Sequence, residues 1–207
     1  MSGAAAADTC TVQDRPAVLV KPRRARDNYS DGSFLYGEGA QAPQHSPSAA
    51  ALYRSTKTYD HSEGLSCCFR QWRAGHSHCR LLHGYALAFK FTFACSELDE
   101  RNWCFDFGGL KPVKAWLHGM FDHTLVVAQD DPALPQFEEL ANGGLVELRM
   151  LPAVGCEATA AFVFEHVSRF VAEQTQGRVW LEAVEVREHG GNSAIYGPNP
   201  HHCRPVL

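Results

Sequence analysis

The sequence predicts an α+β domain in which an antiparallel sheet carries two helices on one face. Residues 83–95, HGYALAFKFTFAC, alternate between large apolar and small or polar side chains, which is the pattern of a half-buried strand. Two later segments repeat apolar residues at helical spacing, and another strand-like segment follows the second of them. Strands, helix, helix and strand in this order are typical of an antiparallel sheet with helices packed on one side.

The first predicted strands form a hairpin. Residues 66–76, SCCFRQWRAGH, have an extended character and precede the strand at 83–95 by only a few residues. The two segments are therefore expected to pair in antiparallel fashion, with Cys79 in their connection. Residues 102–109, NWCFDFGG, are expected to form a third strand that runs into a glycine turn.

The first predicted helix follows directly. Apolar residues recur there at helical spacing, namely Leu110, Val113, Leu117, Met120 and Phe121. Pro112 lies where the first turn of a helix tolerates proline. Residues 128–144 are interpreted as a loop that holds one short helix, and a brief apolar run follows at 145–151.

A second long helix is predicted from about 157 to 174. Its apolar stripe consists of Ala160, Phe164, Val167 and Val171. Gly177 lies just beyond its end, where glycine commonly terminates a helix. Residues 178–189, RVWLEAVEVREH, form the last predicted strand.

The chain is expected to be one domain with appendages. Its 207 residues, 45% of them hydrophobic, can bury one sizeable core but are few for two full domains. Residues 1–51 show no apolar periodicity and are expected to be a mostly disordered leader. An organelle transit peptide is the alternative, although several aspartates interrupt the segment. Residues 52–197 are then the folded domain, and 198–207 are a tail.

Composition favours a small-molecule partner in the cytoplasm. A formal net charge of -4 gives no long-range attraction to nucleic acid or to an anionic membrane. No apolar run approaches the roughly 20 residues that span a bilayer, and the N-terminus lacks the pattern of a secretory signal. The eight cysteines are scattered, and most are expected to be small buried residues instead of disulfide partners.

One segment, GHSHCRLLHGY at 75–85, contains three histidines and one cysteine. His76 and His78 point to the same side of an extended chain, and His83 lies on the returning strand. Three histidine ligands leave the fourth tetrahedral position of a zinc ion open, as in a catalytic site. The alternative is that these histidines are merely solvated at a strand end. Cys79 is a candidate general base or nucleophile, with an ordinary cysteine as the alternative.

Two further groups could carry chemistry. Asp122 followed by His123 could work as a proton relay at the end of the first helix, although a helix C-terminus also favours histidine by its dipole. Glu188 ends the last strand, and its carboxylate could accept two parallel N–H bonds from a guanidine-like ligand edge. A solvent-facing strand end is the alternative.

Five short motifs occur in a fixed order: WRAGH, CRLLHG, FDFGGLK, FDHT with the helix that opens at Glu157, and VREHGGNSAIY. In this order, over roughly Tyr59 to Tyr196, the chain resembles the 6-pyruvoyltetrahydropterin synthase and 6-carboxytetrahydropterin synthase family. The resemblance implies a T-fold (tunnelling fold) subunit, an antiparallel sheet with two helices on one side. It also implies a homo-oligomer, a hexamer of two trimers, with active sites between subunits.

The resemblance also implies roles for individual residues. The family's substrate is 7,8-dihydroneopterin triphosphate. By position, Cys79 moves protons with the help of Asp122 and His123, and Glu188 anchors the pterin ring. Glu157 is expected among the substrate contacts too, although VGC replaces the family's Pro-Thr just before it.

The family holds its zinc with three histidines, and two of these positions fall on His76 and His83. The third comes from a His-x-His pattern that here ends in Tyr85. Because a phenol with an unperturbed pKa near 10 is a poor ligand at neutral pH, His78 is the expected third ligand of a Zn²⁺ cofactor. Tyr85 would then line the pocket, with Cys79 beside the metal as the base.

The expected function is that of a zinc-dependent carbon-oxygen lyase that makes 6-carboxy-5,6,7,8-tetrahydropterin, a step toward queuosine and other deazapurines. The close alternative is the 6-pyruvoyl product of the same substrate. A second alternative is a pterin-binding homologue that has lost catalysis, although it retains Cys79, the Asp-His pair and Glu188. A zinc-stabilised structural module is the third, and it would need a fourth protein ligand.

Overall fold

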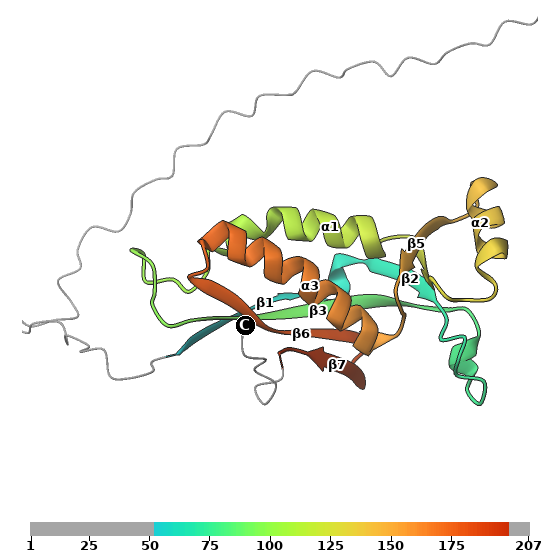
Figure 1. The fold of residues 1–207 in the computed structure, drawn as a ribbon, viewed down its shortest axis with the longest axis horizontal. Helices are drawn as coiled ribbons and strands as arrows, with labels where there is room; N and C mark the ends of the chain where they lie inside the picture. Colours follow the sequence, from blue (N-terminus) through green and yellow to red (C-terminus); the bar gives the residue numbers. More distant parts are fainter. Residues whose placement is uncertain (1–51, 199–207) are drawn as a thin grey trace, which may run out of the picture. The chain divides into compact units, whose positions relative to one another are not determined.

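The computed structural model describes residues 52–198, which form a seven-stranded sheet and three α-helices (Figure 1). The strands are β1 (Tyr53–Tyr59), β2 (Leu65–Phe69), β3 (His83–Cys95), β4 (Thr124–Ala128), β5 (Glu147–Leu151), β6 (Val179–His189) and β7 (Asn192–Tyr196). The helices are α1 (Lys111–Phe121), α2 (Leu134–Asn142) and α3 (Cys156–Thr175), with short 3-10 turns η1 (His61–Glu63), η2 (His78–Arg80) and η3 (Phe107–Leu110). The predicted leader lies outside the described residues, as does the predicted tail beyond Pro198.

The long strand β3 organises the sheet. Its first half pairs with β2, its second half pairs with β1, and β6 lies along its other edge, all in antiparallel fashion. The predicted hairpin of β2 and β3 is therefore confirmed, and Phe69 lies opposite His83 at the end next to the connection. The full order is β5-β4-β2-β3-β6-β7, with β1 beside β3.

The sequence predicts an antiparallel sheet, but the observed sheet is mixed. β4 pairs in parallel with β2, and β5 pairs in parallel with β4. Parallel neighbours need a crossover connection, which the chain supplies with α1 before β4 and with α2 between β4 and β5. The antiparallel expectation holds for β1, β2, β3, β6 and β7.

Helices α1 and α3 lie over one face of the sheet, as predicted (Figure 1). They contact each other through Trp116 of α1, whose ring stacks on His166 of α3 with centroids 3.8 Å apart. The predicted short helix is α2, where Phe137 packs in a separate small cluster with Leu125 and Val127 of β4. Among residues 52–198, no helix combines the length and apolarity that crossing a membrane requires.

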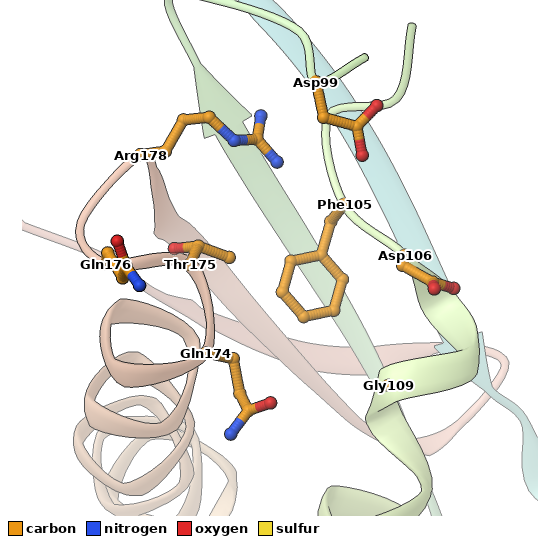
Figure 2. A pocket seen from close by; sticks show the side chains of 8 residues that line it. All are labelled: Asp99, Phe105, Asp106, Gly109, Gln174, Thr175, Gln176 and Arg178. Carbon is orange, nitrogen blue, oxygen red and sulfur yellow. The ribbon is translucent and has the colours of Figure 1, made fainter. Parts of the chain in front are cut away.

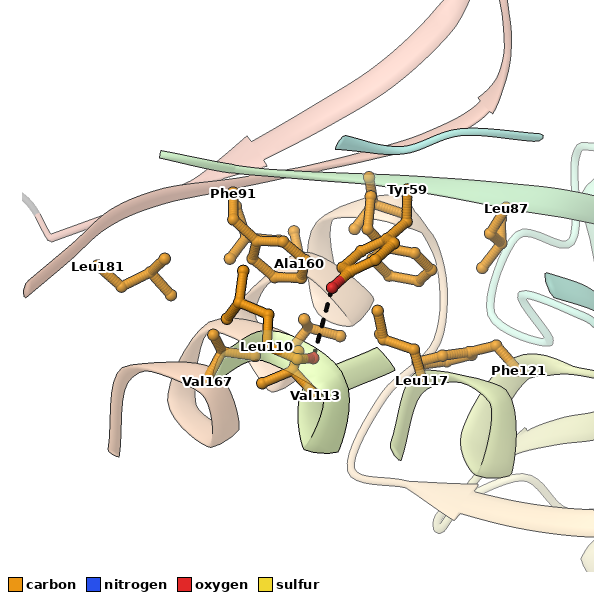
Figure 3. Packing of buried hydrophobic residues seen from close by; sticks show 14 of the residues in the cluster. Tyr59, Leu87, Phe91, Leu110, Val113, Leu117, Phe121, Ala160, Val167 and Leu181 are labelled. Atoms are coloured by element: carbon orange, nitrogen blue, oxygen red, sulfur yellow. Dashed lines mark hydrogen bonds between the residues drawn. The ribbon is translucent and has the colours of Figure 1, made fainter. Parts of the chain in front are cut away.

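The main core lies between β3 and these two helices (Figure 3). The alternation in β3 places Phe89, Phe91 and Phe93 inward, each fully buried. The helices contribute Val113, Leu117, Phe121, Val163, Val167 and Val171. Tyr59 at the end of β1 donates a hydrogen bond from its hydroxyl to the carbonyl of Leu110, which fixes the start of α1 over the sheet.

The predicted strand at 102–109 is wrong. Asp99 accepts hydrogen bonds from the backbone N–H groups of Arg101 and Trp103, both at 2.9 Å. Asp106 accepts one from Gly108 at 2.8 Å and so caps η3. These carboxylates take up the donors that a strand would offer to a neighbour, and the segment forms a loop instead. Its apolar residues are buried all the same, because Phe105 stacks on Phe93 with centroids 4.8 Å apart.

Candidate active site

Three of the predicted site residues line one hollow of about 350 Å³. Cys79 comes from η2 in the β2–β3 connection, Glu157 from the first turn of α3, and Glu188 from the end of β6. We call it the Cys79 hollow; its lining is Gln71, Cys79, Cys156, Glu157, Glu188, Gly191, Asn192 and Ser193. The structure therefore brings together a thiol and two carboxylates that are far apart along the chain.

A hollow of about 390 Å³ at the opposite end of α3 lacks such chemistry (Figure 2). Its charged side chains already hold the backbone. Arg178 donates to the carbonyls of Glu97 and Cys104, at 2.9 and 3.0 Å, and Asp99 and Asp106 accept from the loop that they cap. It contains none of the predicted site residues, so the Cys79 hollow is the candidate active site.

The β2–β3 connection that carries Cys79 is anchored at its start. Arg70 makes two parallel hydrogen bonds to the buried carboxylate of Asp131, at 2.8 and 2.6 Å. The guanidinium holds the pKa of Asp131 below its usual range. Further along, the N–H of Gln71 donates to the carbonyl of Cys79 at 2.8 Å, and the hydroxyl of Ser77 accepts from the N–H of Cys79. The backbone of Cys79 is thus fixed from two sides.

Gly155 allows α3 to begin against this connection. Its φ of +111° lies in the region that favours glycine, and a Cβ at this position would collide with the amide nitrogen of Gln71. Because neither conflict exists with glycine, Gln71 lies against the start of α3, and the first helical turn places Glu157 in the hollow.

Cys156 is a site residue that the sequence reasoning missed. Burial, followed by the charges of Glu188 and Glu157, raises the pKa of its thiol to about 12. The thiol therefore stays protonated at neutral pH, and it lies beside Glu188 and Glu157 in the hollow. Its place next to Glu157, at the first turn of a predicted helix, is the signal that could have identified it.

The turn after β6 closes the hollow. The N–H of Gly191 donates to Nδ1 of His189 at 3.1 Å, which tightens the β6–β7 turn. The register of β6 against β7 also shifts between Arg187 and His189. A register shift of this kind changes the direction of neighbouring side chains. Here Glu188 lines the same hollow as residues 191–193.

Asp122 and His123 form the predicted pair, at the end of α1. One oxygen of Asp122 accepts from Nδ1 of His123 at 2.5 Å, and the other accepts from Nδ1 of His118 at 3.1 Å. These two hydrogen bonds, His118 first, lower the pKa of Asp122. Asp122 is then ionised and accepts only, so both Nδ1 atoms carry hydrogen. A neutral His123 consequently keeps a free lone pair on Nε2.

One subunit does not bring this pair into the Cys79 hollow, whose lining includes neither Asp122 nor His123. The side chain of His123 is 89% exposed. Its backbone φ of +54° is left-handed, which is uncommon for a residue other than glycine. The pair is thus presented outward from the end of α1.

The three candidate zinc ligands are not gathered. His76 and His78 are exposed on the connection, and Nδ1 of His83 is 2.8 Å from the carbonyl of Leu81. Imidazole is a donor that zinc prefers, but among residues 52–198 no three His, Cys, Asp or Glu side chains lie together as a metal site. The ligand set therefore stays a prediction.

Tyr85 occupies the position of the family's third histidine. Its ring lies near those of His83 and His189, with centroids 5.7 and 5.8 Å away. Tyr85 thus takes part in an aromatic cluster with Phe69, at the end of the β2–β3 hairpin next to the connection.

A family model described as 6-pyruvoyl tetrahydropterin synthase matches residues 58–199. Among curated proteins, the chain is similar to the 6-carboxy-5,6,7,8-tetrahydropterin synthase of Rickettsia felis, at 35% identity over 71 residues, which cover 33% of this chain and 51% of the relative. The protein of the same name from Rickettsia typhi is 37% identical over 81 residues, covering 38% of this chain and 59% of the relative. The matches thus span only about half of each relative's length.

Solved structures share the fold. An uncharacterized protein from Wolinella succinogenes superposes with a TM-score of 0.61 at 18% identity, over 72% of this chain and 100% of the other. A catalytic-residue mutant of Plasmodium vivax 6-pyruvoyltetrahydropterin synthase gives a TM-score of 0.55 at 12% identity, over 72% and 99%. These similarities confirm the predicted T-fold. Because the family model also matches well over half of the 207 residues, this chain belongs to the 6-pyruvoyl tetrahydropterin synthase family.

Proposed function

We propose that this protein is a carbon-oxygen lyase that converts 7,8-dihydroneopterin triphosphate into 6-carboxy-5,6,7,8-tetrahydropterin. The observation that carries the proposal is the Cys79 hollow, where a thiol and two carboxylates meet in a chain of the pterin synthase family. The curated relatives named above carry this activity in their names, which favours the 6-carboxy product. The deazapurine pathway and a cytoplasmic location belong to the same proposal and rest on the sequence alone.

Glu188 is the proposed anchor of the pterin ring. The 2-amino group and N3–H of a pterin form a planar donor pair, which a carboxylate matches with two parallel hydrogen bonds. The protonated thiol of Cys156 lines the same hollow and is available as a hydrogen-bond donor beside this carboxylate. Glu157 and the turn residues 191–193 supply further polar contacts in a hollow of about 350 Å³, a size suited to a small ligand.

Cys79 is the proposed proton carrier. It lines the same hollow as Glu188, so a pterin bound there would present its side chain near the thiol. A thiolate at this place would accept a proton from the carbon next to the reacting hydroxyl, and the triphosphate would then leave by elimination. The 6-carboxy product also requires that a carbon-carbon bond of the side chain break, with its two outer carbons leaving as acetaldehyde. When bound, zinc polarises such a hydroxyl and makes the adjacent C–H more acidic. We propose His76, His78 and His83 as its ligands.

The Asp122–His123 pair is proposed to act between subunits. It presents the free Nε2 of His123 to solvent and lies outside the hollow of its own chain. We propose a homo-oligomer, a hexamer of two trimers, in which the pair of one copy serves the Cys79 hollow of the next. Asp122 would hold the tautomer of His123 that accepts a proton at Nε2.

The product of the reaction tests the proposal. The full-length protein is incubated with 7,8-dihydroneopterin triphosphate, and the products are identified by mass, with zinc content per subunit measured on the same sample. We expect 6-carboxytetrahydropterin, free triphosphate and acetaldehyde, because two of the three side-chain carbons of the substrate must leave when only a carboxyl group remains. The 6-pyruvoyl product is the alternative that the description of the family model favours, and unchanged substrate at full zinc loading would contradict both assignments.

A further inference from the structure

His118 occupies the second oxygen of the Asp122 carboxylate. It lies one turn before Asp122 on α1, and its Nδ1 is 3.1 Å from Oδ2, while His123 takes Oδ1. Because Asp122 is ionised and can only accept, its two oxygens are each occupied by an imidazole N–H. The hydrogen bond from His118 makes the largest contribution to the lowered pKa of Asp122.

The other end of the His118 ring faces η1. Nε2 of His118 is 3.9 Å from a carboxylate oxygen of Glu63, and the ammonium of Lys114 is 2.6 Å from that same oxygen. Lys114 lies one turn before His118 on α1. The imidazole therefore lies between two carboxylates, that of Glu63 in η1 and that of Asp122 at the end of its own helix. His118 and Asp122 are each about one third exposed, in contrast to His123.

His123 needs such support because nothing else holds its ring. Of its ring atoms, only Nδ1 has a hydrogen-bond partner among residues 52–198, and that partner is Asp122. Asp122 follows the last residue of the helix, and a carboxylate there can rotate about its terminal torsion at little cost. A second donor from a helical residue restricts this rotation, and the orientation of His123 follows from it.

We propose that His118 is a positioning residue for the reaction: it fixes the Asp122 carboxylate so that Asp122 in turn sets the tautomer and direction of His123. The proposal rests on the proposed function, because it assigns His123 the proton transfer. His118 itself contacts no reacting atom. It acts through Asp122, and Glu63 with Lys114 completes the support.

Two amide variants separate the two ends of the ring. In His118→Asn, the amide nitrogen falls near the position of Nδ1 and keeps a donor for Asp122. In His118→Gln, the amide falls near Nε2, which keeps a partner for Glu63 but removes the donor for Asp122. His118→Leu removes both. His166→Gln is the matched control, since His166 is also a part-buried helical histidine but stacks on Trp116 away from Asp122.

We expect kcat of the full-length protein on dihydroneopterin triphosphate to fall about 10- to 100-fold in His118→Gln and His118→Leu, with KM nearly unchanged, because misplacing a catalytic group by about 1 Å has effects of this size. His118→Asn should restore most of the kcat, and His166→Gln should match the parent. A kcat of His118→Gln equal to that of the parent, or a loss in His118→Asn as large as in His118→Leu, would overturn the proposal.

A second readout does not require turnover. Long-range nitrogen-proton NMR correlations report which ring nitrogen of His123 carries hydrogen. We expect the Nδ1–H form in the parent and in His118→Asn, and a mixture of tautomers in His118→Gln. If the parent makes no pterin product but the tautomers change in this way, the proposed function fails and the positioning role stands. An unchanged His123 tautomer in both His118→Gln and His118→Leu would show that Asp122 needs no second donor.

Discussion

Two cysteines line the same hollow with different chemistry. Cys156 lies beside two carboxylates that, with burial, raise the pKa of its thiol to about 12. A thiol in that state donates a hydrogen bond and does not act as a base at neutral pH. Cys79 lies on the connection between β2 and β3, with its backbone held by Ser77 and Gln71. The role proposed for Cys156 is therefore that of a protonated donor beside the carboxylates, while proton transfer is proposed for Cys79.

Glu188→Gln is expected to weaken pterin binding by roughly 10- to 100-fold, since hydrogen bonds to a charged group contribute about 1.5–3 kcal/mol. The amide would also turn N–H groups toward the donors of the pterin. Fluorescence titration with a pterin measures the dissociation constant. Glu182→Gln is the control on the same strand, because Glu182 pairs with Arg54 outside the hollow. Equal affinity in Glu188→Gln and the parent would place the ring elsewhere.

At this scale the sequence predicts the residues whose chemistry is local to a motif. Cys79, Glu157 and Glu188 line one hollow, and Asp122 bonds His123. Gln71 could not be predicted, because its importance depends on contacts between segments that are far apart in the chain, whereas Cys156 could have been identified from its place next to Glu157. His118 could have been found, since a histidine four residues before an aspartate on a predicted helix faces it.

At the scale of elements, long periodic segments were predictable and short ones were not. β3, α1 and α3 have enough residues for a period to be clear. β4 is five residues long and buried throughout, so its apolar run carries no period that distinguishes strand from helix. β1 and β7 are short and largely exposed, and the sequence patterns predict neither. The error at 102–109 arose because an alternating pattern does not reveal that Asp99 and Asp106 bind the backbone.

Gly155→Ala is expected to reduce the free energy of unfolding by about 1–3 kcal/mol, the usual cost of holding a non-glycine residue in a sparsely populated backbone region. Its φ of +111° and the collision with Gln71 both oppose a side chain. Denaturant unfolding measures the change. Gly119→Ala is the control, because a Cβ there meets open space within α1 and should be neutral or slightly stabilising. Equal stability of the two variants would contradict the role given to Gly155.

Asp131 makes the anchoring of the β2–β3 connection dependent on pH. Arg70 lowers its folded-state pKa below the unfolded value near 3.9, so its contribution is complete above that value and is lost as the pH falls through the folded pKa. Asp131→Asn should cost about 1–3 kcal/mol at pH 7, as for hydrogen bonds to a charged group, and much less near pH 3. Unfolding in urea from pH 7 to pH 3 measures both. A cost that is independent of pH would show that the ion pair contributes nothing.

At the scale of the whole molecule, the fold class was predictable, but the assembly of the site was not. The order of strands and helices gave an α+β sheet with helices on one face. The parallel additions β4 and β5 escaped prediction because strand direction depends on crossovers, which a sequence pattern does not specify. Within one chain, Cys79 and Glu188 share a hollow, whereas the Asp122–His123 pair is presented outward. A site completed by a second copy would account for both placements.

Mixing two inactive variants tests this arrangement. Cys79→Ala alone should lose on the order of 10² to 10⁴ in rate through its missing proton carrier, and His123→Ala should lose activity for the same kind of reason. If the pair of one copy serves the hollow of another, random hybrid oligomers made from equal amounts will combine an intact Cys79 with an intact His123 at about a quarter of their sites. Partial unfolding and joint refolding of the mixture, followed by product analysis, should therefore recover about that share of the parent's rate.

The control is the same treatment of each variant separately, which should recover nothing. A mixture that stays inactive, although native mass spectrometry shows hybrid oligomers, would mean that the thiol and the Asp-His pair serve the same site from within one subunit, or that one of them has no part in the reaction.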